Sequence, residues 1–236
     1  MGKASVTLAA HLAMAEVPVS VVVDFDSGTD KLFKLDLTAA NTKLTPETVD
    51  NTDAFNDWII TQLANAECRY AIGGYLENRT VYSRKQLFGA NDDEPRSIHL
   101  GVDIWAAAGT VVRAVLDGTV HSFGDNAGNG DYGPTIILQH IVNGLTLYSL
   151  YGHLNRKALQ KLQVGQQVHA GQKIAEFGVA DENGYWPPHL HFQLMLDMQG
   201  MHGDFPGVCK PSEKSSYLDI IPDPNLLLNF LPEDYR

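Results

Sequence analysis

The chain has 236 residues, of which 44% are apolar and 19% are charged, which is enough for one large domain with a hydrophobic core. Its net charge of −11 argues against nucleic acid and against an anionic membrane surface as partners, because both bind basic proteins. No segment of the sequence is long and apolar enough to span a membrane. The two cysteines, Cys68 and Cys209, form no disulfide framework, and we expect both to be reduced thiols.

Residues 1–70 predict a small α+β extension. The first 16 residues resemble a secretory signal only weakly, because His11 and Glu16 interrupt the apolar stretch, and they fit a short amphipathic helix equally well. We therefore expect no export signal, which favours a cytoplasmic location. A wall substrate would instead require a periplasmic or cell-surface location.

Two strands and a helix are expected in the rest of this extension. Residues 18–25 are rich in valine and predict a buried strand, and the alternation of apolar and charged residues over 33–37 predicts a second one. Asn51 or Thr52 can cap a helix that runs to about Ala66. The apolar stripe of this helix is typical of core packing.

Residues 71–200 predict a mainly β domain, with short strands separated by turns such as Asp117-Gly118 and Asn143-Gly144. The predicted strands cover residues 70–76, 111–116, 119–123, 135–140, 145–151, 167–168, 173–178 and 189–196. Many short strands at regular spacing favour a β-sandwich or barrel-like core. Residues 157–162 are expected to form a short helical segment. Residues 201–236 form a proline-rich tail with a short helix over Asn225–Phe230.

The strand pattern at residues 189–194 is the first candidate for a functional site. Apolar and polar residues alternate there, so His189 and His191 leave one face of the strand, and two prolines before them favour an extended approach. Two imidazoles on one face suit a metal site, where one ligates the metal and the other acts beside it. For an isolated His-x-His, surface histidines are the commoner explanation.

The second candidate lies at His99-Leu-Gly-Val-Asp103. A spacing of four places His99 and Asp103 on one face of a strand, and imidazole and carboxylate groups are zinc ligands. His153 follows at the end of another apolar strand, in Tyr151-Gly-His-Leu154. Taken alone, each of these residues is explained as an ordinary polar group of a loop or strand end.

Taken in order, these three motifs resemble the lysostaphin or LytM-type zinc metallopeptidases. His-x-Gly-x-Asp at 99–103, Tyr-Gly-His-Leu at 151–154 and Pro-His-Leu-His-Phe at 188–192 follow one another as in that family. The intervening segments 108–120, 133–140 and 164–172 are similar to its turn and strand segments. The resemblance covers residues 73–196, and the ordered set is specific although each motif alone is weak.

The resemblance implies the duplicated hybrid motif fold, one zinc per chain, and hydrolysis of an amide bond in a peptide, most directly in peptidoglycan stems or cross-links. Residue by residue, it implies His99, Asp103 and His191 as zinc ligands and His153 and His189 as two catalytic histidines that do not bind zinc. Zinc would lower the pKa of a bound water towards about 7. One histidine would take its proton and the other would stabilise the oxyanion or protonate the leaving amine. The sequence does not assign these two roles.

This chain departs from the family pattern in the segment before His189, where bulky residues replace the usual small ones. Trp186 is a candidate wall of the substrate cleft, with packing over the β core as an equal alternative. Tyr151 is a second cleft candidate. Tyr132 and Tyr148 could also line the cleft, although a place in the core is the default for a tyrosine, and His140 is expected to be structural. No wall-binding module is recognisable in residues 1–70 or 201–236.

Three alternatives remain beside a wall endopeptidase. A non-catalytic scaffold of the same fold would bind a partner, but such proteins usually lose metal ligands, whereas all five positions are intact here. A phosphoryl-carrying domain of the same fold would use two facing histidines and would not need His99 and Asp103. An intracellular metallohydrolase would keep the chemistry and act on a different peptide or amide. The sequence leaves the oligomeric state open.

Overall fold

A computed structural model describes residues 1–79, 89 and 94–228 of the chain. In these ranges the helices are α1 (Lys3–Ala13), α2 (Pro46–Asp50), α3 (Thr52–Ala66) and α4 (Lys214–Tyr217), and short 3₁₀ turns form η3 (Arg156–Leu159), η4 (Pro211–Glu213) and η5 (Pro224–Leu226). The strands are β1 (Leu32–Lys34), β2 (Tyr70–Gly73), β3 (Ile98–His99), β4 (Val102–Trp105), β5 (Val111–Arg113), β6 (Gly118–Asn126), β7 (Gly133–Val142), β8 (Leu145–Gly152), β9 (Gln167–Val168), β10 (Lys173–Glu176), β11 (His189–Met195) and β12 (Val208–Cys209).

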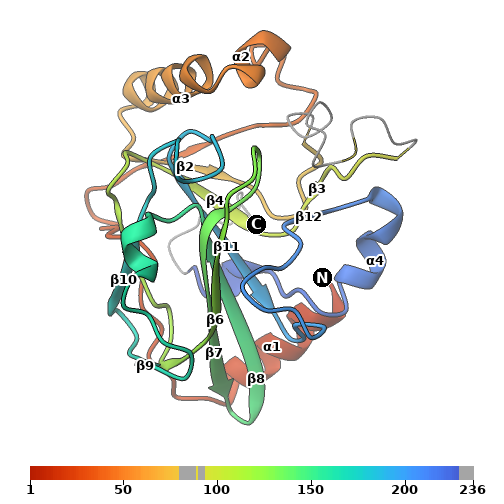
Figure 1. Cartoon of the computed structure of the whole chain (residues 1–236). Coiled ribbons are helices and arrows are strands. Elements are labelled where there is room, and N and C mark those ends of the chain that lie inside the picture. The colour runs from red at the N-terminus through yellow and green to blue at the C-terminus, as the bar shows by residue number, and fades with distance from the viewer. Residues whose placement is uncertain (80–88, 90–93, 229–236) are drawn as a thin grey trace.

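The centre of the molecule is an eight-stranded sheet in the order β1-β2-β4-β11-β8-β7-β6-β9 (Figure 1). Only the β1–β2 pair is parallel, and the other neighbouring strands of this sheet are antiparallel. Two small sheets, β5–β10 and β3–β12, lie beside it. The predicted mainly β fold is confirmed. The strands of the N-terminal extension join the same sheet as the rest of the chain, and the division into three segments stays a prediction.

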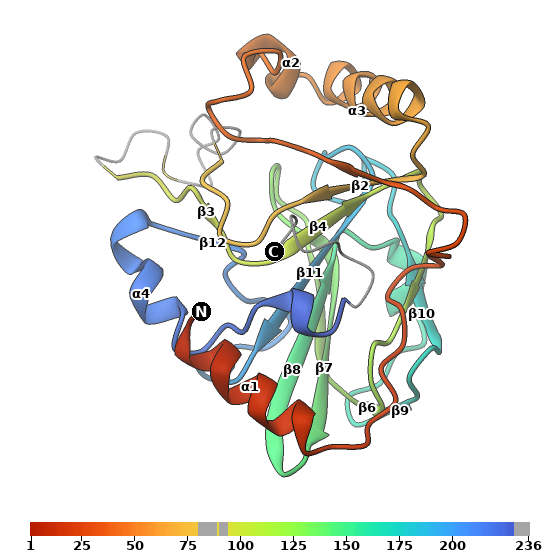
Figure 2. The ribbon, with the colours of Figure 1, turned by 180° about the vertical axis from the view of Figure 1, so that it is seen from behind.

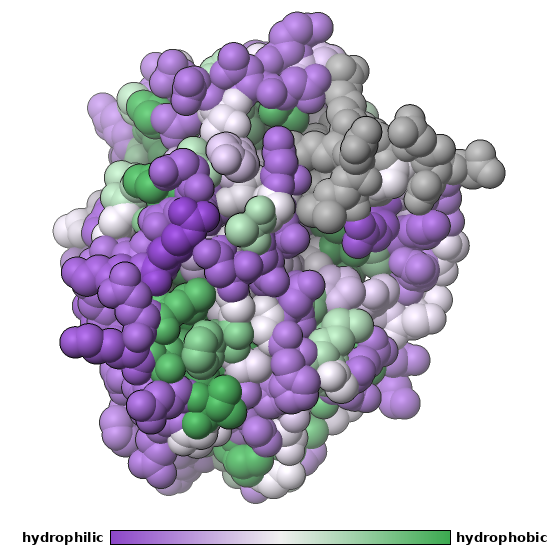
Figure 3. Space-filling view, in the orientation of Figure 1, coloured by the Kyte–Doolittle hydropathy of each residue, from purple (hydrophilic) through white to green (hydrophobic). Residues whose placement is uncertain are grey.

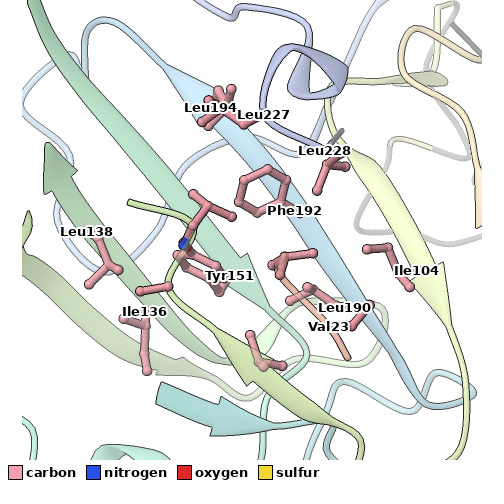
Figure 4. Packing of buried hydrophobic residues seen from close by; sticks show 14 of the residues in the cluster. Val23, Ile104, Ile136, Leu138, Tyr151, Leu190, Phe192, Leu194, Leu227 and Leu228 are labelled. Carbon is pink, nitrogen blue, oxygen red and sulfur yellow. The ribbon is translucent and has the colours of Figure 1, made fainter. Parts of the chain in front are cut away.

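Strand β11 separates a hydrophobic side of the sheet from a polar one. Leu190, Phe192 and Leu194 belong to the largest hydrophobic cluster, in which Figure 4 shows them beside Ile104 and Tyr151. Because side chains alternate along a strand, the histidines of β11 leave from the opposite face. All seven residues of β11 are buried, so its polar side chains are also covered by other parts of the chain.

The segment 18–25 forms no strand, contrary to the prediction from its valines. Val22 and Val23 are fully buried in the main cluster. Two backbone hydrogen bonds join the segment to the region of β5, from Ser20 N to Val115 O and from Arg113 N to Val22 O. An apolar run specifies burial, and burial can be reached without a continuous ladder.

Helix α3 covers the edge of the sheet that is formed by β1, β2 and β4. The prediction of this helix is confirmed, with Asn51 Oδ1 accepting the Ala54 amide at 3.0 Å as N-cap and Glu67 ending the helix in the left-handed region. Its buried Phe55 packs against Trp105 of β4, with ring centroids 5.7 Å apart. Figure 1 shows α2 and α3 together at this end of the molecule.

The N-terminal and C-terminal segments pack against each other. Helix α1 forms where an amphipathic helix was predicted, and Ala4 N donates to Leu218 O at 3.1 Å. Figure 2 shows α1 beside the C-terminal segment at the back of the sheet. The predicted tail helix is reduced to the turn η5, and Phe230 at its predicted end lies outside the described residues.

Two further predictions concern the covalent and membrane context. Cys68 and Cys209 are free thiols, as predicted. None of the helices in the described ranges has the length and apolarity of a membrane span. Figure 3 shows a mainly hydrophilic face with one compact hydrophobic group at its lower left, over the side where β9 and β10 lie.

Candidate metal centre

Three strands bring His99, Asp103 and His191 together on the polar side of the sheet. The β4–β11 ladder pairs Asp103 directly with His191. His99 and Asp103 do not share one continuous strand, contrary to the sequence argument, because β3 ends at His99 and β4 begins at Val102. The turn between them contains Gly101, where a Cβ would lie 2.7 Å from the His191 ring. Glycine is therefore required for the close approach.

The distances within this triad match those of a metal site. His99 Nε2 lies 3.2 Å from Asp103 Oδ1 and 3.0 Å from His191 Nδ1, and His191 Nδ1 lies 3.0 Å from Asp103 Oδ1. A tetrahedral zinc with bonds of about 2.0–2.1 Å separates its ligand atoms by about 3.3 Å. Since the three side chains are buried, they already stand at the spacing that a zinc ion requires.

Hydrogen bonds on the outer side of each imidazole fix which nitrogen faces the centre of the triad. His99 Nδ1 donates to Gly74 O at 2.9 Å, because a carbonyl can only accept, and this leaves the Nε2 lone pair for the centre of the triad. Gln193 Nε2 donates to Pro206 O at 3.1 Å, which orients the Gln193 Oε1 towards His191 Nε2 at 2.9 Å. His191 therefore donates from Nε2 and keeps the Nδ1 lone pair for the metal. The donor set fits zinc.

His153 and His189 stand beside the triad with their rings 4.0 Å apart. His153 Nδ1 donates to Asn183 O and His189 Nδ1 donates to Pro187 O, both at 2.8 Å. Each ring thus has Nε2 as its unprotonated nitrogen. The ring of Trp105 stacks on His189 at 3.9 Å, which fixes the orientation of that imidazole.

Burial keeps these histidines neutral. It lowers the pKa of His99 and of His189 to about 4, and it lowers the pKa of His153 well below its usual value. Burial acts to raise the pKa of the Asp103 carboxyl, but the neighbouring His99 and Arg79 hold that pKa well below its usual value. At neutral pH the imidazoles of His99, His153 and His189 are therefore neutral, and the carboxyl of Asp103 is ionised.

A cavity of about 270 Å³ opens onto the triad. Asp103, His153 and His191 form its floor, and its other walls come from residues 130–132 and from the segment 201–208. Tyr132 stands closest to the histidines, with its hydroxyl 3.3 Å from His191 Nε2. A Cβ at Gly207 would collide with this hydroxyl, so the glycine makes room for it.

The two predicted cleft residues do not line this cavity. Tyr151 is fully buried in the main cluster (Figure 4), where its hydroxyl accepts the Val115 amide at 3.1 Å. Trp186 is 5% exposed and packs in the second hydrophobic cluster with Phe55 and Trp105. The sequence left Trp186 either in the wall of the cleft or packed over the β core, and the structure shows it packed over the core. The Tyr151 prediction failed because the aromatic side chains of β8 alternate between the two sides of the sheet.

Several residues of the site were missed by the sequence argument. Asn183 is fully buried, and its side chain bonds Trp186 N and O at 3.0 Å while its carbonyl holds His153. In the sequence, Gln193 stood out only as one of the polar residues that alternate with apolar ones along residues 189–194. The segment 201–208 was predicted only as part of the proline-rich tail, and the structure places it in the wall of the cavity. His140 is structural as expected, with Nδ1 bonded to Asp117 O and Nε2 2.7 Å from Ser149 Oγ.

A buried His-Asp-His triad, with His153 in the wall of the same cavity and His189 next to His153, has the donor atoms and the neutral bases that a metal-dependent hydrolase needs. Residues 97–202 match the family model described as Peptidase family M23. Residues 97–202 of the chain are therefore a domain of this metallopeptidase family.

Similar proteins were found among both curated sequences and solved structures. An L-Ala–D-Glu endopeptidase of Bacillus subtilis is 34% identical over 52% of this chain and 37% of its own length. A glycyl-glycine endopeptidase of Staphylococcus capitis is 37% identical over 42% of this chain and 25% of its own length. The structure of the catalytic domain of lysostaphin from Staphylococcus simulans is 31% identical, with 51% of this chain and 80% of that chain covered and a TM-score of 0.34. The chain thus spans little more than a third of these curated relatives at most.

Proposed function

We propose that this chain is a zinc-dependent endopeptidase that hydrolyses an amide bond in a peptidoglycan stem or cross-link, with one zinc per chain. The observation that carries the proposal is the triad of His99, Asp103 and His191, whose nitrogen and oxygen atoms that face one another stand 3.0–3.2 Å apart. The relatives are named as endopeptidases of L-Ala–D-Glu and glycyl-glycine bonds, which supports a wall peptide as substrate.

The bound zinc would supply a Lewis acid that lowers the pKa of water and polarises the substrate carbonyl. His153 and His189 would move the protons. Each is neutral and carries its proton on Nδ1, so Nε2 of one accepts the proton of the attacking water. The imidazolium formed in this way then gives the same proton to the leaving amine, directly or through the other histidine, whose ring centroid lies 4.0 Å away. The outer hydrogen bonds to Asn183 and Pro187 prevent either ring from turning during the reaction.

The cavity walls would hold the substrate backbone beside these groups. Tyr132 closes one side and stands within reach of the histidines, and its phenol offers both an apolar face and a hydroxyl to a peptide. The intact triad argues against a non-catalytic scaffold and against a phosphoryl carrier, since neither needs three ligand atoms at this spacing.

The test is a digestion of three substrates by the zinc-loaded chain, followed by mass spectrometry. The substrates are a muropeptide with an L-Ala–D-Glu bond, a peptide with a glycine bridge, and a linear peptide unrelated to the wall. We expect cleavage of a wall peptide only. Cleavage of the unrelated peptide alone would contradict the substrate class, and no cleavage of any peptide would contradict the activity.

A further inference from the structure

Two consecutive ion pairs, Glu77–Arg79 and Arg79–Asp103, lie next to the metal triad. Arg79 has only 1% of its side chain exposed, and its Nη1 donates to Asp103 Oδ2, the carboxylate oxygen that faces away from the two histidines. Its Nε donates to Glu77 Oε2 at 2.7 Å. The other oxygen of Glu77 accepts the Leu37 amide at 3.3 Å. These hydrogen bonds therefore connect Leu37 of the N-terminal extension to Asp103, a predicted zinc ligand.

We propose that Arg79, held by Glu77, is a positioning residue that leaves Asp103 a single oxygen for the metal. This inference rests on the proposed zinc site. Because the guanidinium occupies Oδ2, only Oδ1 points to His99 and His191. The carboxylate then acts as a ligand through Oδ1 alone. Its orientation is fixed by Arg79 at Oδ2 and by the two histidines at Oδ1.

The surrounding backbone makes room for this arrangement. Gly73 is paired with Asp103 in the β2–β4 ladder, and a Cβ at Gly73 would meet the guanidinium of Arg79. Gly74, the next residue, accepts the hydrogen bond that orients His99. The turn from Gly73 to Arg79 is tied to β3, since Leu76 N donates to His99 O and His99 N donates to Glu77 O. One turn thus supports two of the three ligands.

Charge explains why Glu77 belongs to the arrangement. A lone guanidinium in contact with a ligand would repel a dication in a buried site, where charges interact strongly. The carboxylate of Glu77 offsets that repulsion, so Arg79 can orient Asp103 with little loss of metal affinity. Removal of Arg79 alone would leave Glu77 as an extra negative charge, which would attract the metal and hide the loss of orientation.

The test compares Arg79→Lys, the double variant Glu77→Gln/Arg79→Met, and a control, Arg113→Met. Arg79→Lys keeps the charge and loses the forked geometry, and the double variant removes both charges together. Arg113 pairs with Asp24 on another side of the molecule, with its side chain 30% exposed, so it reports the general effect of losing an arginine. The readouts are zinc affinity by chelator competition and the visible spectrum of the cobalt(II)-loaded protein.

We expect zinc to bind about 10–100-fold more weakly to the double variant, as is typical for lost partners of metal ligands. Its cobalt bands should weaken and shift, because a freed Asp103 can offer both oxygens and raise the coordination number. Arg79→Lys should change the spectrum in the same direction, and this variant carries the test if the double variant does not fold. Arg113→Met should match the wild type in both measurements.

The inference is overturned if Arg79→Lys, or the folded double variant, shows wild-type zinc affinity and an unchanged cobalt spectrum. Failure of the proposed function is distinct, because it would appear in the wild type as absent zinc binding or absent cleavage. Neither readout depends on turnover.

Discussion

His153 occupies a backbone conformation that side chains other than glycine rarely adopt. Its φ is 61°, which costs about 1–2 kcal/mol for an L-residue. The strain is held by His153 N to Tyr132 O, by Gly178 N to His153 O and by the bond from its ring to Asn183. These contacts aim the ring at the cavity, so the structure spends stability on the placement of one imidazole.

The two histidines outside the triad should be needed for turnover and not for metal binding. His153→Ala and His189→Ala should each lower kcat by about 10²–10⁴-fold, the usual effect of losing a proton-transfer group. Zinc content should stay at the wild-type level. His153→Gly should melt at a higher temperature than His153→Ala, because glycine tolerates a positive φ. Wild-type turnover in either alanine variant would contradict these roles.

The triad should behave in the opposite way. Asp103→Ala and His191→Ala should lose most of the zinc, because each removes one of three donor atoms. His140→Ala is the matched control, since His140 is equally buried and bonds only within the sheet and its turn. Metal analysis of the purified proteins measures the outcome. Retention of full zinc content in both triad variants would show that the ion binds elsewhere.

At the scale of elements, strand β11 and its neighbours position the site, while α3 supports it from outside. Phe55 of α3 packs on Trp105, and Trp105 stacks on His189. Thr52 at the start of α3 also donates to Tyr185 O at 2.8 Å, in the loop before β11. Helix α3 of the N-terminal extension is therefore part of the support of the site.

Trp186 belongs to this support. Trp186→Ala should lower the free energy of unfolding by about 3–5 kcal/mol, as is usual for a buried tryptophan, and should leave KM unchanged in enzyme that remains folded. Trp58→Ala is the control, because Trp58 is only partly buried in the same cluster and should cost less. Thermal melting and KM are measured together. A raised KM with unchanged melting temperature would return Trp186 to the cleft.

The sequence predicted the parts of the site that depend on local spacing. Alternation along one strand placed His189 and His191 on one face, and Asn51 marked the start of α3. The partners that come from distant segments were not predictable, because nothing near Gln193 in the sequence indicates the carbonyl of Pro206, and nothing near Asp103 indicates Arg79. Residues 18–25 show the converse limit, since their valines predicted burial correctly and a strand wrongly.

For the molecule as a whole, the site makes the fold sensitive to acid. Burial lowers the pKa of His99 and His189 to about 4, and it also lowers the pKa of His140 and of His153. In the unfolded chain a histidine has a pKa of about 6.5. Between these pH values the histidines bind protons in the unfolded state and not in the folded state. Their contribution to the free energy of unfolding is therefore fully present above pH 6.5 and falls as the pH drops.

Each such histidine contributes a slope of about 1.4 kcal/mol per pH unit once the pH lies well inside this window. Urea unfolding of the metal-free protein should therefore show a free energy of unfolding that falls by several kcal/mol between about pH 7 and about pH 5. The metal-free form is used because bound zinc would add its own proton linkage. His140→Gln removes one of the four histidines without touching the triad. Its unfolding free energy should therefore change less steeply with pH, by the slope that one proton contributes, whatever the stability of the variant at neutral pH. An unfolding free energy that stays constant over this range, or an unchanged slope in His140→Gln, would mean that the folded protein accepts protons on these imidazoles.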